Sequence, residues 1–414
     1  MSDYGIPSEY REELRRIVSC VKHLRTAKPG KVTSWEKAAE CHIKYSNLYG
    51  SPVLALTITL SPTGCEWARK GGCTMCGEFE GSLKRKSLIK NPQFHVSQFA
   101  AAIGDRRIWE LAHNEERPIS WLRINQEGNY TNKNEMSVTA QETILRLAIR
   151  IKGIQRITIE SRPQYITEDS VAFLRSIFEG SGVELEIGMG MEAVNDVVRN
   201  VCINKQGTKE QFASAATLLR KNNMLPLAYV LLKPPFLTEM EAIEEATDTA
   251  HFAHDAGFSR ISFEPMTIHH YTLVDALAKA GYYTPPWLWS VIEVAKRCSD
   301  ISHIFGIGGV GYYPIPKEYS SNQCSQEPNC TEAFARAIKQ YNASRDVSIF
   351  DGLSCDCQKE WITECAKRGS PFKDRMQEQL TKVEEFLPGY SIDEARDVED
   401  VPLRNARILF SYSQ

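Results

Sequence analysis

Short apolar runs alternate with longer amphipathic segments between residues 50 and 265. Apolar, β-branched runs bounded by glycine, proline or polar residues are typical of buried strands, and apolar residues at helical spacing are typical of helices that pack on them. The alternation predicts an α/β fold, a parallel (βα)6 partial TIM-like barrel. The predicted strands cover 53–60, 119–125, 155–160, 183–188, 226–232 and 259–263, and the predicted helices cover 139–151, 167–179, 208–222 and 239–256.

The barrel pattern is flanked by segments of different character. Amphipathic spacing predicts helices over 8–25, 35–45, 287–297 and 371–386, and residues 303–310 add a further predicted strand. We therefore divide the chain into an N-terminal helical extension (1–50), the partial barrel (51–315), a small cysteine-rich module (316–370) and a C-terminal helix with an irregular tail (371–414).

Charge and apolar content narrow the functional classes. The net charge of −3 gives no general positive field for nucleic acid, although Lys84, Arg85 and Lys86 form a basic run that is either a contact patch or a solvated loop. No apolar segment reaches the roughly 18 residues of a membrane span, and the polar N-terminus lacks the apolar stretch of a signal peptide. We therefore expect a cytoplasmic protein without membrane attachment. Twelve cysteines in a reducing compartment indicate metal binding or catalysis rather than disulfides.

Three closely spaced cysteines follow the first predicted strand. Cys65, Cys73 and Cys76 lie in the loop after 53–60, and the active groups of such barrels lie at the carboxyl ends of the strands. Three thiolates can ligate three irons of a [4Fe–4S] cluster. The fourth iron then stays open for the amino and carboxylate groups of S-adenosylmethionine (AdoMet), whose chemistry the protein positions and shields from water.

Two other interpretations of this loop stay open. A structural zinc site needs four protein ligands, and the nearest other cysteine, Cys41, precedes the strand. The three cysteines could also be unrelated buried side chains. The flanking residues favour the cluster, because Met75 lies between two ligands where it can cover the cluster, and Gly77 lets the backbone approach closely.

The loop also resembles a known motif. Residues 63–77, Thr-Gly-Cys-Glu-Trp-Ala-Arg-Lys-Gly-Gly-Cys-Thr-Met-Cys-Gly, are similar to the cluster motif of the archaeosine synthase radical AdoMet family, a relative of the Elp-type radical proteins. The resemblance implies reductive cleavage of AdoMet, radical chemistry on an aminoacyl adduct of a modified tRNA guanine, and a reductase or flavodoxin-type electron donor. It extends over residues 50–365 and includes Glu160-Ser-Arg-Pro163, Tyr229–Leu237, Pro285–Ser290, and Cys355-Asp-Cys357 followed by Trp361.

The resemblance implies further roles at the ends of three more strands. Radical AdoMet enzymes contact the methionine amino group after the second strand, the ribose and carboxylate after the third, and adenosine after the fourth. A carboxylate can accept from two ribose hydroxyls, and an arginine can donate two hydrogen bonds to the AdoMet carboxylate. For Glu160 and Arg162, the alternative is a salt bridge to each other at the strand end. The residues concerned are Gln126, Glu127, Gly128 and Asn129, then Glu160 and Arg162, then Gly188, Met189 and Gly190.

The sixth predicted strand departs from the family pattern. Phe263–His270 stands where the family is expected to carry an Asn-Pro-x-Asn-type stretch, which indicates a changed substrate. Glu264 and His269 on this rim, with Lys233 after the fifth strand, are therefore the candidate catalytic residues. The alternatives are loop histidines without a role at 269 and 270 and, for Lys233, a snorkelling surface lysine.

A second group of cysteines lies near the C-terminus. Four thiolates from one module suit a tetrahedral structural zinc, which is our first interpretation, and such a site would clamp the module to the barrel. An auxiliary iron–sulfur cluster and unligated cysteines are the alternatives. Cys20, Cys202, Cys298 and Cys365 lie in helix-like or apolar runs and read as ordinary buried cysteines. The four candidate ligands are Cys324, Cys330, Cys355 and Cys357.

Two further hypotheses for the function stay open beside the tRNA reaction. The same cluster could act on a small molecule in a biosynthetic pathway, in one version by transferring a 3-amino-3-carboxypropyl group from AdoMet. A non-catalytic, metal-stapled binding protein is the other, and it predicts zinc in both cysteine groups. The sequence leaves open the substrate, the bond of AdoMet that is cleaved and the oligomeric state.

Overall fold

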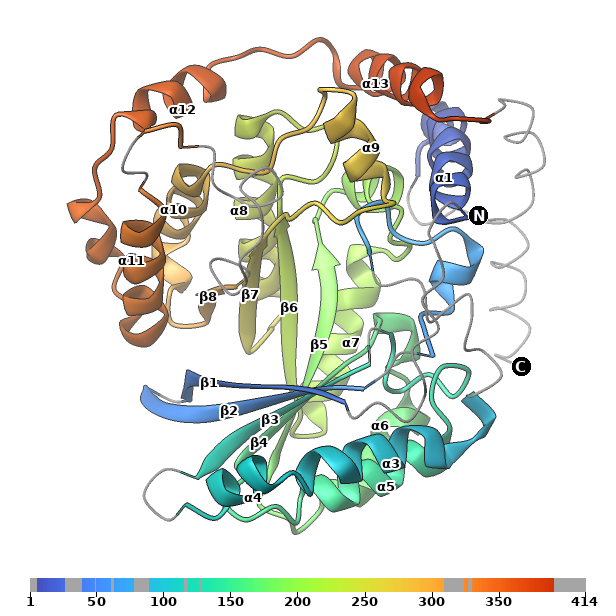
Figure 1. The fold of residues 1–414 in the computed structure, drawn as a ribbon, viewed down its shortest axis with the longest axis vertical. Coiled ribbons are helices and arrows are strands. Elements are labelled where there is room, and N and C mark those ends of the chain that lie inside the picture. Colours follow the sequence, from blue (N-terminus) through green and yellow to red (C-terminus); the bar gives the residue numbers. More distant parts are fainter. Residues whose placement is uncertain are drawn as a thin grey trace.

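A single curled sheet of eight strands organises the protein (Figure 1). The computed structural model describes residues 6–26, 39–48, 50–60, 63–77, 89–114, 118–126, 128–308, 324–326 and 330–390. Glu127 and the basic run at 84–86 lie outside the described residues. In sheet order, the strands are β1 (Glu40–Leu48), β2 (Ser51–Thr59), β3 (Ile119–Asn125), β4 (Arg156–Glu160), β5 (Glu184–Glu192), β6 (Leu225–Leu232), β7 (Arg260–Pro265) and β8 (Phe305–Ile307).

The order of the strands in the sheet is their order in the chain. Each neighbouring pair from β2 to β8 is parallel, so each connection crosses over one face of the sheet and returns to the same edge. This topology confirms the predicted α/β class and the partial TIM-like barrel. All the carboxyl ends of these strands therefore lie on one rim.

The first strand corrects the sequence prediction. We predicted a helix over 35–45, but Glu40–Leu48 is an antiparallel edge strand paired with β2. A tight turn at Gly50, whose φ is 81°, joins the two strands, and its N–H donates to the Asn47 side chain (2.8 Å). Cys41 and Ile43 pack against the core from alternate positions. This period of two was the sequence signal for a strand. The edge of β2 would otherwise be unpaired, and pairing with it favours the strand over the helix.

The other predicted helices lie within a few residues of where they were expected. Threonine side chains cap the starts of α6, α7 and α8, and each threonine N–H donates in return to the side chain of the third helical residue. Several further helices between and after the strands were not predicted. The α-helices are α1 (Arg11–Thr26), α3 (Pro92–Ile103), α4 (Arg106–Ala112), α5 (Val138–Ala148), α6 (Glu168–Phe178), α7 (Lys209–Lys221), α8 (Glu239–Asp255), α9 (Leu273–Lys279), α10 (Leu288–Arg297), α11 (Thr331–Ser344), α12 (Cys357–Cys365) and α13 (Phe372–Phe386).

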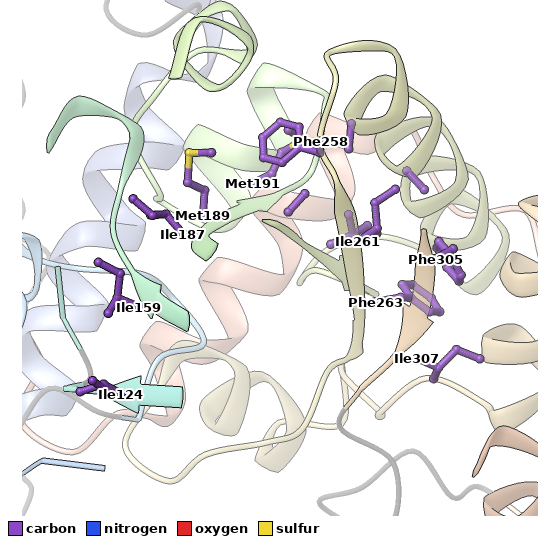
Figure 2. Close-up of a cluster of buried hydrophobic side chains, with 14 of the residues drawn as sticks. Ile124, Ile159, Ile187, Met189, Met191, Phe258, Ile261, Phe263, Phe305 and Ile307 are labelled. Atoms are coloured by element: carbon purple, nitrogen blue, oxygen red, sulfur yellow. The ribbon is translucent and has the colours of Figure 1, made fainter. Parts of the chain in front are cut away.

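The main hydrophobic core lies between the sheet and these helices. Figure 2 shows Ile124, Ile159, Ile187, Ile261 and Phe263, which come from β3, β4, β5 and β7 and belong to one buried cluster. Because side chains alternate along a strand, the residues between them face the inside of the curled sheet. The outer face is therefore apolar, and the inner face is free to carry polar groups.

Helix α11 connects the two edges of the sheet. On β8, the Ile307 N–H donates to the Asn342 side chain (2.9 Å), whose amide donates back to the Ile307 carbonyl (2.7 Å), much as a further strand would. On β1, the Asn47 amide donates to the Ala343 carbonyl (2.8 Å). The segment that carries the second cysteine group is therefore packed onto the barrel. None of the helices in the described ranges is both long and apolar enough to cross a membrane.

Candidate active site and metal centres

The loop that carries the first three cysteines leaves the carboxyl end of β2. Cys65, Cys73 and Cys76 are of intermediate burial, and none of them forms a disulfide with another described cysteine. A short 3-10 helix over Trp67–Lys70 takes up part of the long spacing between the first two. The structure thus places all three on the rim of the barrel, as the sequence predicted.

Hydrogen bonds from an adjacent segment hold this loop in place. Trp67 Nε1 donates to the Asn204 carbonyl (2.7 Å), and Asn204 Nδ2 donates to the Gly72 carbonyl (2.8 Å). The Thr74 N–H donates to the Ile203 carbonyl (2.9 Å). Because the residues around 203 follow β5, the cysteine loop is attached across the rim to the middle of the sheet.

A buried carboxylate, Glu135, joins the loop to the segment after β3. Its side chain is fully buried and accepts from the Glu66 N–H (2.8 Å), Asn132 Nδ2 (2.9 Å) and Asn129 Nδ2 (2.8 and 2.9 Å). Burial raises the pKa of Glu135, and these donors oppose that shift. The sequence analysis missed this residue.

Asn129, a predicted cofactor residue after β3, lies beside the first cysteine. Its Nδ2 lies 3.9 Å from Cys65 Sγ, and its Oδ1 accepts from the Arg162 N–H (2.8 Å). Arg162 is buried, and its guanidinium donates to the carbonyls of Lys205 and Gln206. The ends of β2, β3 and β4 are therefore joined through one asparagine, beside the first cysteine.

Two neighbours of Asn129 differ in their surroundings. Gln126 is 2% exposed, and among the described residues neither its Nε2 nor its Oε1 has a hydrogen-bond partner. A buried amide without partners is costly unless another group completes its bonds. Gly128 packs so tightly that a Cβ there would lie 2.6 Å from Glu135 Oε2. The unsatisfied amide of Gln126 therefore indicates that a polar ligand binds there and completes its hydrogen bonds.

Glu160 ends β4 on the inner face of the sheet. Its Oε1 accepts from the Tyr229 hydroxyl (2.7 Å), and burial raises its pKa. Gly188 leaves room for the tyrosine, because a Cβ there would lie 2.7 Å from Tyr229 Cε2. The strand-end salt bridge that we considered for Glu160 and Arg162 does not form, since Glu160 bonds the tyrosine and Arg162 bonds backbone carbonyls.

The other two residues of the β5 motif face opposite ways. Met189 is fully buried in the hydrophobic cluster on the outer face (Figure 2). Gly190 lies beside the ion pair between Lys205 Nζ and Glu192 Oε1 (2.8 Å), and a Cβ there would approach both side chains to 2.4 Å. The Met189 side chain therefore faces away from the inner face that carries Glu160.

The residues after β7 meet the cysteine loop. A Cβ on Gly77 would lie 2.7 Å from His269 Cβ, so the glycine makes room for this histidine one residue after Cys76. The Met75 side chain is partly buried and packs against a second hydrophobic cluster. Glu264, at the end of β7, accepts from Ser262 Oγ (2.6 Å), and burial raises its pKa.

Lys233 follows β6 in a buried environment. Its side chain is 7% exposed, and its Nζ lies 2.6 Å from Glu239 Oε2 and 3.2 Å from Thr284 Oγ1. The snorkelling alternative is therefore wrong, because the ammonium group is buried against a carboxylate. Glu239 Oε1 also accepts from Ser290 Oγ (2.5 Å), which ties this pair to α10.

A paired polar layer forms the floor of the barrel below the rim. The Trp121 ring lies 4.2, 5.4 and 4.9 Å from the guanidiniums of Arg123, Arg156 and Arg260. Glu186 is 1% exposed and accepts from Arg260 at 2.8 and 2.6 Å. Burial alone would raise the pKa of Glu186, but the two arginines Arg260 and Arg156 outweigh it, and the pKa is lowered.

The second cysteine group has the geometry of a single-ion site. Cys324 Sγ and Cys355 Sγ lie 3.7 Å apart, Cys330 Sγ and Cys357 Sγ lie 3.8 Å apart, and all four sulfurs lie within 4.8 Å of one another. Four thiolates around a tetrahedral ion with bonds of about 2.3 Å would be separated by about 3.8 Å. Trp289 Nε1 donates to Cys357 Sγ (3.3 Å) and links the group to α10. The structure thus unites the four cysteines that the sequence singled out.

Known proteins with similar sequences agree with the resemblance of the cysteine loop. No protein-family model matches this chain. An archaeosine synthase subunit beta from Methanosarcina acetivorans is 27% identical over 320 residues, which cover 75% of this chain and 85% of the relative. The subunit from Thermococcus kodakarensis is 28% identical over 320 residues, covering 76% and 93%. An uncharacterised Methanocaldococcus jannaschii protein is 29% identical over 309 residues, covering 74% and 80%. The sequence of this chain is therefore similar, over about three quarters of its length, to proteins named archaeosine synthase subunit beta.

Similarity to solved structures is weaker. The Elp3 protein of Methanocaldococcus infernus with an N-terminal deletion has a TM-score of 0.41 and 12% identity, covering 66% of this chain and 62% of Elp3. A TM-score at that level does not establish a common fold. The assignment of the archaeosine-synthase-like protein therefore rests on the sequence relatives and on the three-cysteine loop at the end of β2. It confirms the predicted superfamily and the predicted enzyme class, so the non-catalytic hypothesis loses its support.

Proposed function

We propose that Cys65, Cys73 and Cys76 hold a [4Fe–4S] cluster and that AdoMet binds at its open iron. Within the described residues, these three sulfurs do not gather as tightly as the second group, as expected for ligands of three separate irons. The observation that carries the proposal is the buried, unpartnered amide of Gln126 on the rim that bears the cysteine loop. When bound, the cluster supplies the electron for reductive cleavage of AdoMet.

The surrounding side chains suit the positioning of AdoMet. Glu135 orients Asn129 beside Cys65, and Tyr229 orients the Glu160 carboxylate. Arg162 is held in place by two backbone carbonyls and brings a buried cation to the same rim. In the proposal, Glu160 accepts from ribose hydroxyls, Arg162 faces the AdoMet carboxylate and the β5 glycines face adenosine. Asn129 and Gln126 lie on the side of the methionine amino group.

Replacing Gln126 by methionine should weaken AdoMet binding without weakening the fold. Loss of one buried hydrogen-bonding group raises the dissociation constant about tenfold. The protein without AdoMet should unfold at the same temperature or higher, because an orphaned amide is replaced by an apolar group. Calorimetric titration of the reconstituted protein and thermal unfolding measure the two effects.

Gln141 offers a matched control for this variant. It is also buried, but its Nε2 donates to the Met136 carbonyl (2.8 Å). Gln141→Met should therefore lower stability and leave AdoMet affinity unchanged. If Gln126→Met instead behaved like Gln141→Met, the ligand role of Gln126 would be wrong.

For the substrate, we propose an aminoacyl adduct of a modified tRNA guanine that is converted towards archaeosine. The support is the similarity to two proteins named archaeosine synthase subunit beta over most of both chains. That name also supports a partner subunit, and a reductase or flavodoxin-type protein stays our predicted electron donor. His269, beside Gly77 of the cysteine loop, and Glu264, at the end of β7, are the candidates for substrate contact.

Deletion of the gene in its host tests this assignment with the natural partners present. Archaeosine should disappear from total tRNA and return on complementation with the wild-type chain, but not with Cys73→Ala. Nucleoside analysis by mass spectrometry measures this. Intact archaeosine in the deletion strain would overturn the substrate. In that case, the purified protein with dithionite and AdoMet distinguishes the usual cleavage, which yields 5′-deoxyadenosine, from aminocarboxypropyl transfer, which yields 5′-methylthioadenosine.

For the second site, we propose a structural zinc ion on Cys324, Cys330, Cys355 and Cys357. The support is the sulfur separation of 3.7 and 3.8 Å, which suits one tetrahedral ion better than ligands on separate irons. The Trp289 N–H to Cys357 Sγ bond is the kind of outer contact that orients a metal ligand. Zinc would hold α12 and the start of α11 against α10.

A further inference from the structure

Helix α1 brings an arginine from outside the barrel to the cysteine loop. Arg25 is 5% exposed, and its Nη1 donates to the Ala68 carbonyl (3.0 Å). Its Nη2 donates to the Cys73 carbonyl (3.1 Å). The same Cys73 carbonyl accepts from the Cys76 N–H (3.3 Å), which forms the turn between the two cysteines. One guanidinium therefore bridges the two halves of the loop.

The loop is shaped around this guanidinium at Gly72. A Cβ on Gly72 would lie only 2.3 Å from Arg25 Nη1, and the φ of Gly72 is 79°, in the region that favours glycine. Next to it, a Cβ on Gly71 would lie 3.2 Å from Val18 Cγ1, also on α1. The two glycines thus let the loop pack directly on the helix that carries Arg25.

The charge of Arg25 faces the cysteine thiolates. Burial lowers the pKa of Arg25, and the thiolates of Cys76, Cys73 and Cys65 oppose that shift. A buried cation interacts with nearby charge more strongly than an exposed one, because the surroundings screen it less. The arrangement therefore suits a centre at the three cysteines that carries negative charge.

The helix that carries Arg25 is itself packed against the rest of the protein. Near its start, Arg16 forms a two-pronged ion pair with Glu384 of α13 (Nε to Oε1 2.8 Å, Nη2 to Oε2 2.6 Å). Figure 1 shows α1 and α13 side by side, and Ile17, Val21 and Leu380 belong to one buried cluster. Arg25 is thus attached to packed helices rather than to a surface loop.

We propose that Arg25 is a positioning residue for the [4Fe–4S] cluster, whose two hydrogen bonds set the shape of the cysteine loop and whose fixed charge makes reduction of the cluster easier. The inference rests on the proposed function, because it requires the cluster. Reduction by one electron from dithionite or the natural donor adds one negative charge to the cluster. A fixed cation beside the ligands stabilises that charge and raises the reduction potential.

The test compares Arg25→Met, Arg25→Lys and Arg16→Met in the full-length reconstituted protein. Iron content and the cluster's midpoint potential, followed by electron paramagnetic resonance during titration with dithionite, are the readouts. Arg25→Met should shift the reduction equilibrium roughly tenfold towards the oxidised cluster, which is about 59 mV for one electron. Arg25→Lys should retain most of the potential because it keeps the charge. Arg16→Met should leave the potential unchanged, although it removes a partly buried ion pair from the same helix.

Each outcome decides the proposal. Iron lost from the Arg25 variants but kept by Arg16→Met supports the positioning role, because the loop then needs the two carbonyl contacts. Wild-type iron content and potential in Arg25→Met overturn it. Equal losses in Arg25→Met and Arg16→Met also overturn it, since they reflect general weakening of α1. Failure of the proposed function looks different, because the wild-type protein itself would then hold no iron–sulfur cluster.

Discussion

Replacement of Cys73 by alanine should abolish iron binding and AdoMet cleavage together. The wild-type protein should hold about four irons per chain at the first site after anaerobic reconstitution. Without Cys73, a cubane has only two protein ligands, and the rate of 5′-deoxyadenosine formation should fall to background. Iron and sulfide analysis, with chromatography of the nucleoside products, measures both effects. Metal at the second cysteine group should be retained, because Cys73 lies on the barrel rim and not in that group.

Cys41→Ala is the matched control for this prediction. Cys41 is also a free, partly buried cysteine, but it lies on β1 and not in the loop. We expect the control to bind iron and cleave AdoMet like the wild-type protein. If Cys73→Ala kept its iron, or if the wild-type protein bound zinc alone and left AdoMet intact, the assignment of the first site would be wrong.

Replacement of Cys357 by alanine should remove the metal from the second site and lower stability. Cys357 is fully buried and accepts from Trp289 Nε1 (3.3 Å), so its loss opens the site and leaves an indole N–H without its sulfur partner. Loss of a structural ion typically costs several kcal/mol, and we expect the unfolding temperature to fall by roughly 5–10 °C. Differential scanning calorimetry with metal analysis measures the change. A strong zinc chelator should shift the wild-type protein in the same direction.

Cys365→Ala is the control for the second site. Cys365 ends the same helix, α12, but lies outside the four-thiolate group. It should keep one metal per chain and nearly wild-type stability. The zinc proposal fails if Cys357→Ala unfolds at the wild-type temperature, or if the wild-type site contains iron and inorganic sulfide. The second result would favour the auxiliary cluster.

The cysteines of both sites could be found from the sequence for different reasons. Cys65, Cys73 and Cys76 are local: they lie within one loop after an apolar strand, so spacing and position suffice. The four cysteines of the second group are separated by α11, and the sequence could only suggest that they meet. Their approach to 3.7 and 3.8 Å follows from the packing of that helix against the sheet edges.

The residues that organise the rim were harder to find. Glu135 precedes a helix and has no distinctive neighbours beyond the asparagines at 129, 132 and 134. Its role arises because the segment after β3 folds back under the cysteine loop. For Lys233, the sequence left a substrate contact and a snorkelling surface lysine as the two alternatives. Only the position of Glu239, six residues later on α8, shows that the lysine is buried in an ion pair.

The sequence by itself determined the alternation of strands and helices, the order of the sheet and the two sets of cysteines. These features depend on hydrophobic period and short-range spacing, which a single chain displays directly. The tertiary structure alone decided that residues 40–48 form an edge strand, because the free edge of β2 outweighs a weak local preference. It alone also placed Arg25 and Glu135 against the cysteine loop. Their partners are mostly distant backbone groups, and contacts of that kind leave no pattern in the sequence, because every residue offers the same carbonyl and N–H.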